Sequence, residues 1–151
     1  MRVSAKADYA VRAAAELAAA GDEPVKGERL AEAQDIPLQF LEHILLEMKH
    51  HGIVRARRGA KGGYWLAKPA DSITVADIVR AVEGPIAHVQ SSPPEDIEYK
   101  GHAAHLQEVW IAVRANLRAV LEHVTLADLV SGELPPAVKD LAAPADAWAP
   151  R

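Results

Sequence analysis

The 151-residue sequence predicts a mainly α-helical protein with one small β-hairpin. Two short helical segments lie close together at 27–33 and 37–49, and a basic, glycine-rich hairpin pattern follows at 53–67. A third observation is a long apolar helical pattern over 104–124. Two adjacent helices followed by a hairpin is the order of a winged helix-turn-helix, and a long apolar helix after it is typical of a dimerisation helix.

The first helix is expected over residues 4–20, because Ser4 can cap its start and Gly21 can end it. After the short helix at 27–33, a break follows at residues 35 and 36, and Pro37 suits the first position of the next helix. The apolar spacing of that helix places its larger side chains on a core face: Phe40, Leu41, Ile44, Leu45 and Met48.

The hairpin at 53–67 is called the wing here. Residues 53–57 alternate apolar and basic side chains, as half-buried strands do, and glycines at 59, 62 and 63 supply a turn before a second strand at 64–67. Thr74 and Asp77 resemble a capping box that opens a further helix, which Gly84 and Pro85 close. Residues 1–84 are therefore expected to form one winged helix-turn-helix domain.

The remaining sequence divides into three parts. Residues 85–103 lose periodicity and are expected to form a loop, disordered in part, whereas residues 104–131 contain the long helix and a short following one. Residues 132–151 form a proline-rich and alanine-rich tail that we expect to be flexible. The long helix is too apolar on one face for so small a domain to cover, which predicts a homodimer interface over 104–124; an intramolecular packing helix is the alternative.

Composition excludes several classes of protein. The chain has no cysteine, which excludes disulfides, thiolate nucleophiles and thiolate metal sites. No segment approaches the roughly 20 apolar residues that span a bilayer, and nothing resembles a secretory signal, so we expect a cytoplasmic protein without membrane contact. An enzyme is not expected, because neither a phosphate-binding loop nor a complete set of nucleophile and base or of metal ligands is present.

The charge of the chain is unevenly distributed. The formal net charge of −4 argues weakly against nucleic-acid binding. However, no acidic residue lies between Met48 and Ala70, where six cations gather: Lys49, Arg55, Arg57, Arg58, Lys61 and Lys68. Phosphates respond to such a local patch more than to the net charge, so the wing is a candidate for contact with double-stranded DNA.

Several segments closely resemble the Rrf-type repressors, the winged-helix family of IscR, NsrR and CymR. The segments are 9–13 in the first helix, 36–42 at the start of the second helix of the helix-turn-helix, 58–67 in the wing and 77–84 after it. The resemblance is strong over residues 1–84 and extends by pattern alone over 104–130. It implies a homodimeric, sequence-specific DNA-binding regulator that acts as a repressor on a palindromic operator.

Candidate base contacts follow from the expected docking of the helix at 37–49. The amino-terminal turn of a recognition helix enters the major groove, so Pro37, Gln39, Glu42 and His43 can face base edges. Gln39 can pair with adenine and Glu42 can accept from a cytosine amino group. An ordinary solvated carboxylate is the alternative for Glu42.

The resemblance implies further DNA contacts. Family members use the glutamate at position 42 and the arginine of the Arg58-Gly59 pair, which reaches the minor groove from the wing tip. Backbone at Lys61, Gly62 and Gly63 is expected against phosphates, whereas Arg55 and Arg57 can equally be plain outward strand charges. Ser4, Lys6 and Tyr9 look like family phosphate contacts, and Tyr9 can equally be a core residue.

The segment at 85–103 departs from the best-known relatives. Iron–sulfur members place three cysteines there, whereas this chain has Ala104 and Gln107 where the last cysteine and a histidine ligand look to fall. Asp8 matches a carboxylate ligand of NsrR-like members, but one aspartate cannot hold a cluster. We therefore expect no cysteine-ligated iron–sulfur cluster and no other cofactor.

Three histidines, His88, His102 and His105, suggest one alternative. Together with Asp8 or a partner-chain residue they could ligate a metal such as zinc, although loop histidines are usually solvated. A small molecule or a protein partner remains open as the effector. A winged-helix protein-interaction module without DNA binding is the other functional alternative, and the six cations around the wing argue against it.

Overall fold

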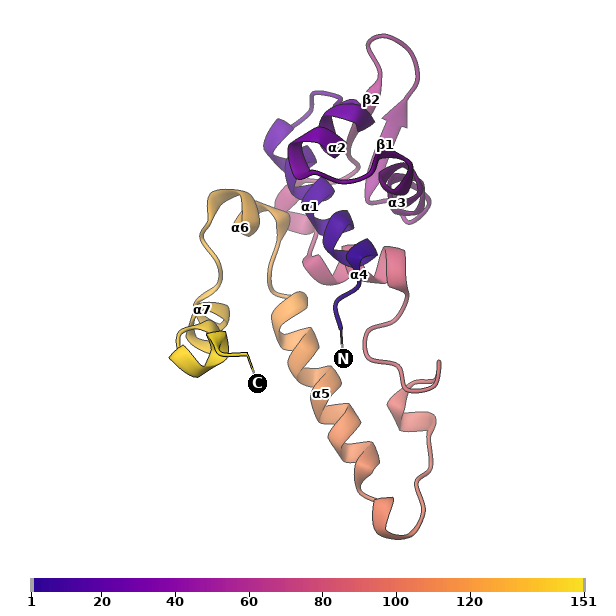
Figure 1. Cartoon of the computed structure of the whole chain (residues 1–151), viewed down its shortest axis with the longest axis vertical. Helices are drawn as coiled ribbons and strands as arrows, with labels where there is room; N and C mark the ends of the chain where they lie inside the picture. The colour runs from indigo at the N-terminus through magenta and orange to yellow at the C-terminus, as the bar shows by residue number, and fades with distance from the viewer. Residues whose placement is uncertain (1, 151) are drawn as a thin grey trace.

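The computed structural model describes residues 2–150 and confirms a mainly helical chain with a two-stranded hairpin (Figure 1). The elements in chain order are α1 (Ala5–Ala20), α2 (Gly27–Gln34), α3 (Leu38–His50), β1 (Val54–Arg57), β2 (Gly63–Leu66), α4 (Val75–Glu83), α5 (Leu106–Leu121), α6 (Leu126–Ser131) and α7 (Pro136–Ala142).

The helix ends follow local capping chemistry. The Ser4 hydroxyl accepts a hydrogen bond from the Ala7 amide at 3.0 Å, which caps α1 as expected. At α4, the Thr74 hydroxyl accepts from the Asp77 amide and the Asp77 carboxylate accepts from the Thr74 amide, so the predicted capping box is complete. The same reciprocal pair, Thr125 and Asp128, opens α6.

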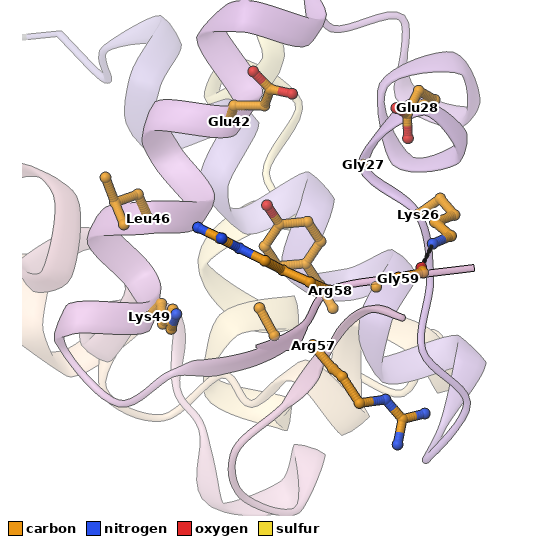
Figure 2. Close-up of a pocket in the computed structure, with 12 residues that line it drawn as sticks. Lys26, Gly27, Glu28, Glu42, Leu46, Lys49, Arg57, Arg58 and Gly59 are labelled. Atoms are coloured by element: carbon orange, nitrogen blue, oxygen red, sulfur yellow. Dashed lines mark hydrogen bonds between the residues drawn. The ribbon is translucent and has the colours of Figure 1, made fainter. Parts of the chain in front are cut away.

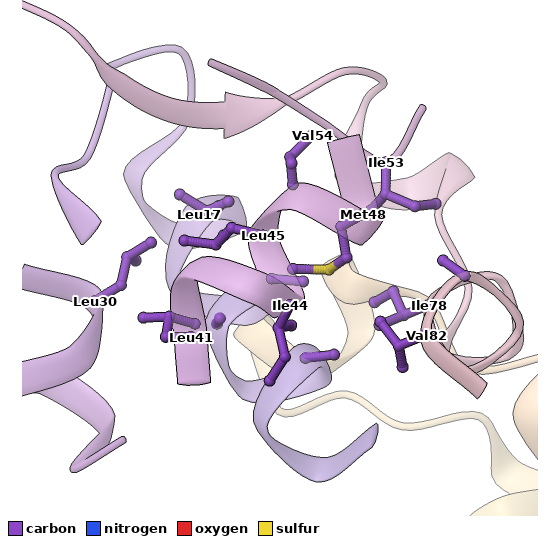
Figure 3. Packing of buried hydrophobic residues seen from close by; sticks show 14 of the residues in the cluster. Leu17, Leu30, Leu41, Ile44, Leu45, Met48, Ile53, Val54, Ile78 and Val82 are labelled. Carbon is purple, nitrogen blue, oxygen red and sulfur yellow. The ribbon is translucent and has the colours of Figure 1, made fainter. Parts of the chain in front are cut away.

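One apolar core unites the first four helices. Figure 3 shows side chains from α1, α2, α3 and α4 meeting around Leu45 and Met48, and Leu126 from α6 joins the same cluster. The expectation that Phe40 belongs to this core is wrong, because its side chain is 41% exposed. Phe40 lies at the edge of the buried face of α3, where its ring meets that of Tyr9 edge-on at 5.7 Å between centroids.

The wing is tied to the helical domain by a third segment. β1 and β2 pair antiparallel, with Val54 opposite Leu66 and Arg57 opposite Gly63. Val25, in the loop before α2, exchanges two backbone hydrogen bonds of 2.9 and 2.8 Å with Tyr64 of β2. This pairing explains Gly63, because a Cβ there would lie 2.6 Å from the Val25 carbonyl oxygen.

The carboxyl-terminal half is built differently. From α4 the chain leads away from the core, and α5 brings it back toward α6 (Figure 1). The segment at 85–103 contains two 3-10 turns that the sequence did not predict, Pro94–Asp96 and Gly101–Ala103, and Pro94 is buried. The return is fastened by two backbone hydrogen bonds, from Val75 to the Val124 carbonyl and from Leu126 to the Ile73 carbonyl.

The tail contains secondary structure that the sequence did not predict, and its flexibility stays a prediction. It contains α7 and a 3-10 turn, Ala145–Trp148, and the Trp148 indole donates a hydrogen bond of 2.6 Å to the Ala142 carbonyl. Leu141 and Trp148 nevertheless remain 62% and 77% exposed. Among residues 2–150, no helix has the length and apolarity needed to cross a membrane.

Candidate DNA-binding surface

The start of α3 is divided between a buried and an exposed face. Leu41, Ile44, Leu45 and Met48 are buried in the core. The predicted base contacts lie on the other face, where Pro37, Gln39, Glu42 and His43 are all exposed. The structure therefore brings the four side chains together at one accessible helix end, which leaves them free to meet a partner.

A groove separates α3 from the wing (Figure 2). Its cations come from three elements: Lys26 before α2, Lys49 on α3, and Arg57 and Arg58 on the wing. The other side chains that line it are Glu28, Glu42, Leu46, Ala56 and Tyr64. The groove combines cations, which attract phosphates, with two carboxylates. Phosphates repel these carboxylates, but the amino group of a base can donate a hydrogen bond to them.

The tip of the wing carries the predicted minor-groove residues. Arg58, Gly59 and Lys61 are exposed, and Figure 2 shows Arg58 extending across the groove toward Leu46. Arg57 is not a plain outward charge, because its guanidinium donates to the Lys61 carbonyl at 3.0 Å and so braces the turn.

Gly62 is buried, and a Cβ there would lie 2.0 Å from the Arg57 carbonyl oxygen. Close packing inside the hairpin is therefore sufficient to explain why position 62 is a glycine, and no DNA contact is needed for that explanation. Its backbone contact with phosphate stays a prediction.

Tyr64 of β2 also lines the groove and is half-buried. Burial raises the pKa of its hydroxyl, and the nearby carboxylates of Glu42 and Glu28 raise that pKa further. The tyrosine therefore stays neutral and can donate a hydrogen bond at physiological pH. Sequence reasoning missed Tyr64, Lys26 and Glu28, because the pairing of Val25 with β2 that brings them together has no sequence signal.

Leu46 could have been found from the sequence. It is 47% exposed on the polar face of α3, one turn after Glu42. An apolar side chain at that place in the groove can contact a thymine methyl group.

The predicted phosphate contacts at the start of α1 have partners within the chain. The Ser4 hydroxyl donates to the Glu83 carboxylate, and the Lys6 ammonium pairs with Glu47 of α3 at 2.8 Å. Tyr9 is half-buried, with the Arg12 guanidinium 5.1 Å from its ring centroid. These contacts place the start of α1 beside α3, and the DNA role of the three residues stays a prediction.

The candidate metal ligands are not brought together. Asp8 pairs with Arg12 at 3.0 Å, and His88, His102 and His105 are exposed, with His105 3.7 Å from Glu108. Across residues 2–150, no three histidine, aspartate or glutamate side chains are arranged to hold a metal ion. The metal-sensing alternative also draws on a residue of a partner chain, and it stays a prediction.

Known proteins resemble the chain over most of its length. It is 48% identical over 143 residues to a Mycobacterium tuberculosis protein named as an HTH-type transcriptional regulator, a match that covers 94% of this chain and 89% of that protein. It is 36% identical over 132 residues to the regulator CymR of Bacillus subtilis, covering 87% of this chain and 91% of CymR.

Solved structures show the same architecture. The structure of CymR, the global cysteine regulator of B. subtilis, aligns with a TM-score of 0.74 at 33% identity over 87% of this chain and 98% of CymR. That of T. potens IscR aligns with a TM-score of 0.69 at 31% identity, over 87% and 88% of the two chains. These relatives are transcriptional regulators and not enzymes.

A family model for Rrf2, described as an iron-dependent transcriptional regulator, matches residues 3–132. The residues present do not fit a cysteine-ligated cluster, since the chain has no cysteine. The winged-helix fold, the basic groove and the matches over most of the length agree with one another. The chain therefore belongs to the Rrf2 family of winged-helix transcriptional regulators, as a member without the cluster cysteines.

Proposed function

We propose that the protein is a homodimeric, sequence-specific DNA-binding repressor that uses no iron–sulfur cluster. The observation that carries the proposal is the exposure of α5 along its whole length. Within the part of the chain that the structure describes, none of its sixteen residues from Leu106 to Leu121 is buried. Apolar side chains nevertheless recur along it, and Val109 is 50% exposed. A second copy of α5 is the natural cover for this face, because a two-fold pairing buries the same apolar patch on both chains.

The proposed dimer suits a symmetric operator. Two winged helices related by a two-fold axis contact two half-sites about 34–36 Å apart, one helical turn of DNA. The exposed start of α3 would enter the major groove, and Arg58 would reach the adjacent minor groove. Lys49 and Lys61 would lie near phosphates, which supply affinity, whereas Gln39 and Glu42 would supply base discrimination.

A cluster-free regulator needs another way to order the residues before α5, and the structure contains one. The Gln107 amide nitrogen lies 3.2, 3.1 and 3.0 Å from the carbonyl oxygens of Pro94, Glu95 and Ile97. The Arg114 guanidinium pairs with the Glu95 carboxylate at 2.7 Å. Protein contacts thus hold this turn on α5, and we propose that they replace metal ligation.

The effector is proposed to be a small molecule or a protein partner that acts through α5 in the cytoplasm. A path to the DNA-binding half exists at the far end of α5. There Glu122 accepts from Arg80 of α4 and, at 2.9 Å, from Arg118 of α5. A change in the position of α5 would therefore move α4, which packs in the winged-helix core.

Binding-site selection from a randomised duplex pool, followed by fluorescence anisotropy on the selected duplex, tests this proposal. We expect a symmetric site and an affinity that falls steeply as salt rises, because the wing cations release counterions from phosphate. Arg58→Ala should weaken binding, whereas Lys100→Ala, an exposed cation outside the groove, should leave it unchanged. A folded protein that selects no sequence would overturn the proposal and favour the protein-interaction alternative.

Repression itself is tested by transcription in vitro from a promoter that carries the selected site.

A further inference from the structure

Lys26 makes a contact that the proposed DNA surface does not yet explain. It precedes α2 and occupies the N-cap position without capping the helix through its side chain. Its ammonium donates instead to the carbonyl oxygen of Gly59 at the tip of the wing, 33 residues away (Figure 2). Two side chains hydrogen-bond to carbonyl groups of the turn at 58–62 within residues 2–150. Arg57 belongs to the hairpin itself, whereas Lys26 lies outside it.

The backbone explains how Lys26 reaches the wing. Val25 is paired by two hydrogen bonds with Tyr64, which lies one residue pair from the turn end of the hairpin, where Arg57 faces Gly63. Lys26 therefore lies beside the turn end of the hairpin, and its side chain reaches the Gly59 carbonyl in the turn. Gly59 has a φ of 100°, and its carbonyl also accepts from the Gly62 amide at 3.0 Å. One carbonyl oxygen has two lone pairs and can accept from both donors.

A wing of this size needs such support. Each strand has four residues, and the pairing of Val25 with Tyr64 supports β2 but does not include the turn at 58–62. The tip residues 58–61 are exposed and gain little from burial. An unsupported tip would lose conformational entropy on binding DNA, which weakens affinity.

We propose that Lys26 is a positioning residue that holds the turn of the wing, and with it Arg58, in place for DNA. The inference rests on the proposed function and adds to it a residue whose effect passes through another. A simpler role, direct contact between Lys26 and a phosphate, predicts a different pattern of mutational effects. The two roles can be separated by their dependence on Arg58.

A double-mutant cycle separates them. Lys26→Met keeps the length of the side chain but removes the donor, and Lys49→Met is the matched control, an exposed cation in the same groove without a hydrogen bond to the wing. Lys26→Met should weaken binding to the selected duplex about fivefold in the wild-type background, the scale of a partly exposed charge-assisted hydrogen bond. In the Arg58→Ala background its effect should fall below about twofold.

Lys49→Met should weaken binding by the same factor in both backgrounds. Equal effects of Lys26→Met in both backgrounds would overturn the positioning role and indicate direct phosphate contact. Lys26→Arg, which retains the charge and can donate, should recover at least part of the lost affinity.

A second readout needs no DNA. Hydrogen exchange of the Gly62 amide, measured by NMR on the free full-length protein, reports the turn directly, because this amide donates to the carbonyl that Lys26 holds. Lys26→Met should accelerate its exchange about three- to fivefold, and Lys49→Met should not. Unchanged exchange in Lys26→Met would overturn the inference. If Lys26→Met accelerates exchange of the Gly62 amide but the wild type binds no DNA sequence, Lys26 does hold the turn and the proposed function is wrong.

Discussion

The two halves of the chain differ in how much of their apolar surface is buried. From α1 to α4, a continuous set of side chains with no measurable exposure fills one core, including Leu17, Ile44 and Leu45. From α5 to α7, Leu126 is buried against that core, while α5 and α7 bury none of their own residues within the described chain. The first half therefore contains most of the core, which Leu126 of α6 completes, and the second half leaves apolar side chains such as Val109 exposed.

This difference also separates the two kinds of function. The first half presents the groove that we propose faces DNA, where side chains must be held in place to discriminate bases. The extended half is attached to it by a short backbone pairing at Thr74 and Thr125 and by the Arg80–Glu122 ion pair. The buried side chain of Leu126 adds to this connection, so the proposed interface helix α5 is coupled to the winged helix at its carboxyl-terminal end.

The largest expected effect comes from a core substitution. Leu45→Ala should lower the free energy of unfolding by about 2–5 kcal/mol, because it leaves a cavity beneath α3. Leu141→Ala, in the exposed α7, should change it by less than about 0.5 kcal/mol. Urea unfolding followed by circular dichroism measures both. Equal losses would show that the tail belongs to the cooperative core and would break the contrast between the halves.

A charge on α5 should affect assembly more than folding. Val109→Asp should raise the dissociation constant of the dimer at least about tenfold, because it would bury an unpaired carboxylate in the proposed interface. Glu108→Ala, beside it and also exposed, is the control. Sedimentation at several concentrations gives the constants, and a dimer unaffected by Val109→Asp would remove this face of α5 from the interface.

Within the DNA surface, the recognition helix and the wing should differ in kind. Gln39→Ala and Glu42→Ala should each cost about 1–3 kcal/mol at particular base pairs and change which bases are tolerated. Arg58→Ala should weaken binding to all duplexes in the pool alike. If all three variants only scale affinity uniformly, α3 does not contact base edges.

The smallest expected effect is a pH dependence where the halves join. The hydrogen bonds from Arg80 and then Arg118 hold the pKa of Glu122 below its ordinary value of 4.5. A lowered pKa in the folded state stabilises the protein above the ordinary value, and this stability is lost as pH falls through the lowered pKa. Glu122→Gln should therefore flatten the dependence of unfolding on pH below about 4.5, measured by urea titration at each pH. An unchanged profile would show that the ion pair contributes nothing measurable.

The sequence predicted most of the winged helix because its signals are local. Capping by Ser4 and Thr74, the apolar spacing of α3 and the glycines of the wing each act within a few residues. Phe40 was misplaced because helical spacing alone does not show where a buried face ends. The donor role of Arg57, the contact from Lys26 and the turn held by Gln107 depend on distant carbonyl groups, which no sequence pattern reveals. The helix in the tail was missed because alanines and prolines there are equally typical of a loop.

The central claim is that two copies, joined through α5, bind one operator. Light scattering coupled to size-exclusion chromatography on the complex with the selected duplex measures it directly, with Val109→Asp run in parallel. We expect two chains per duplex for the wild type, and a loss of tight binding for the variant because its dimer dissociates. One chain per duplex, bound as tightly by the variant as by the wild type, would contradict it.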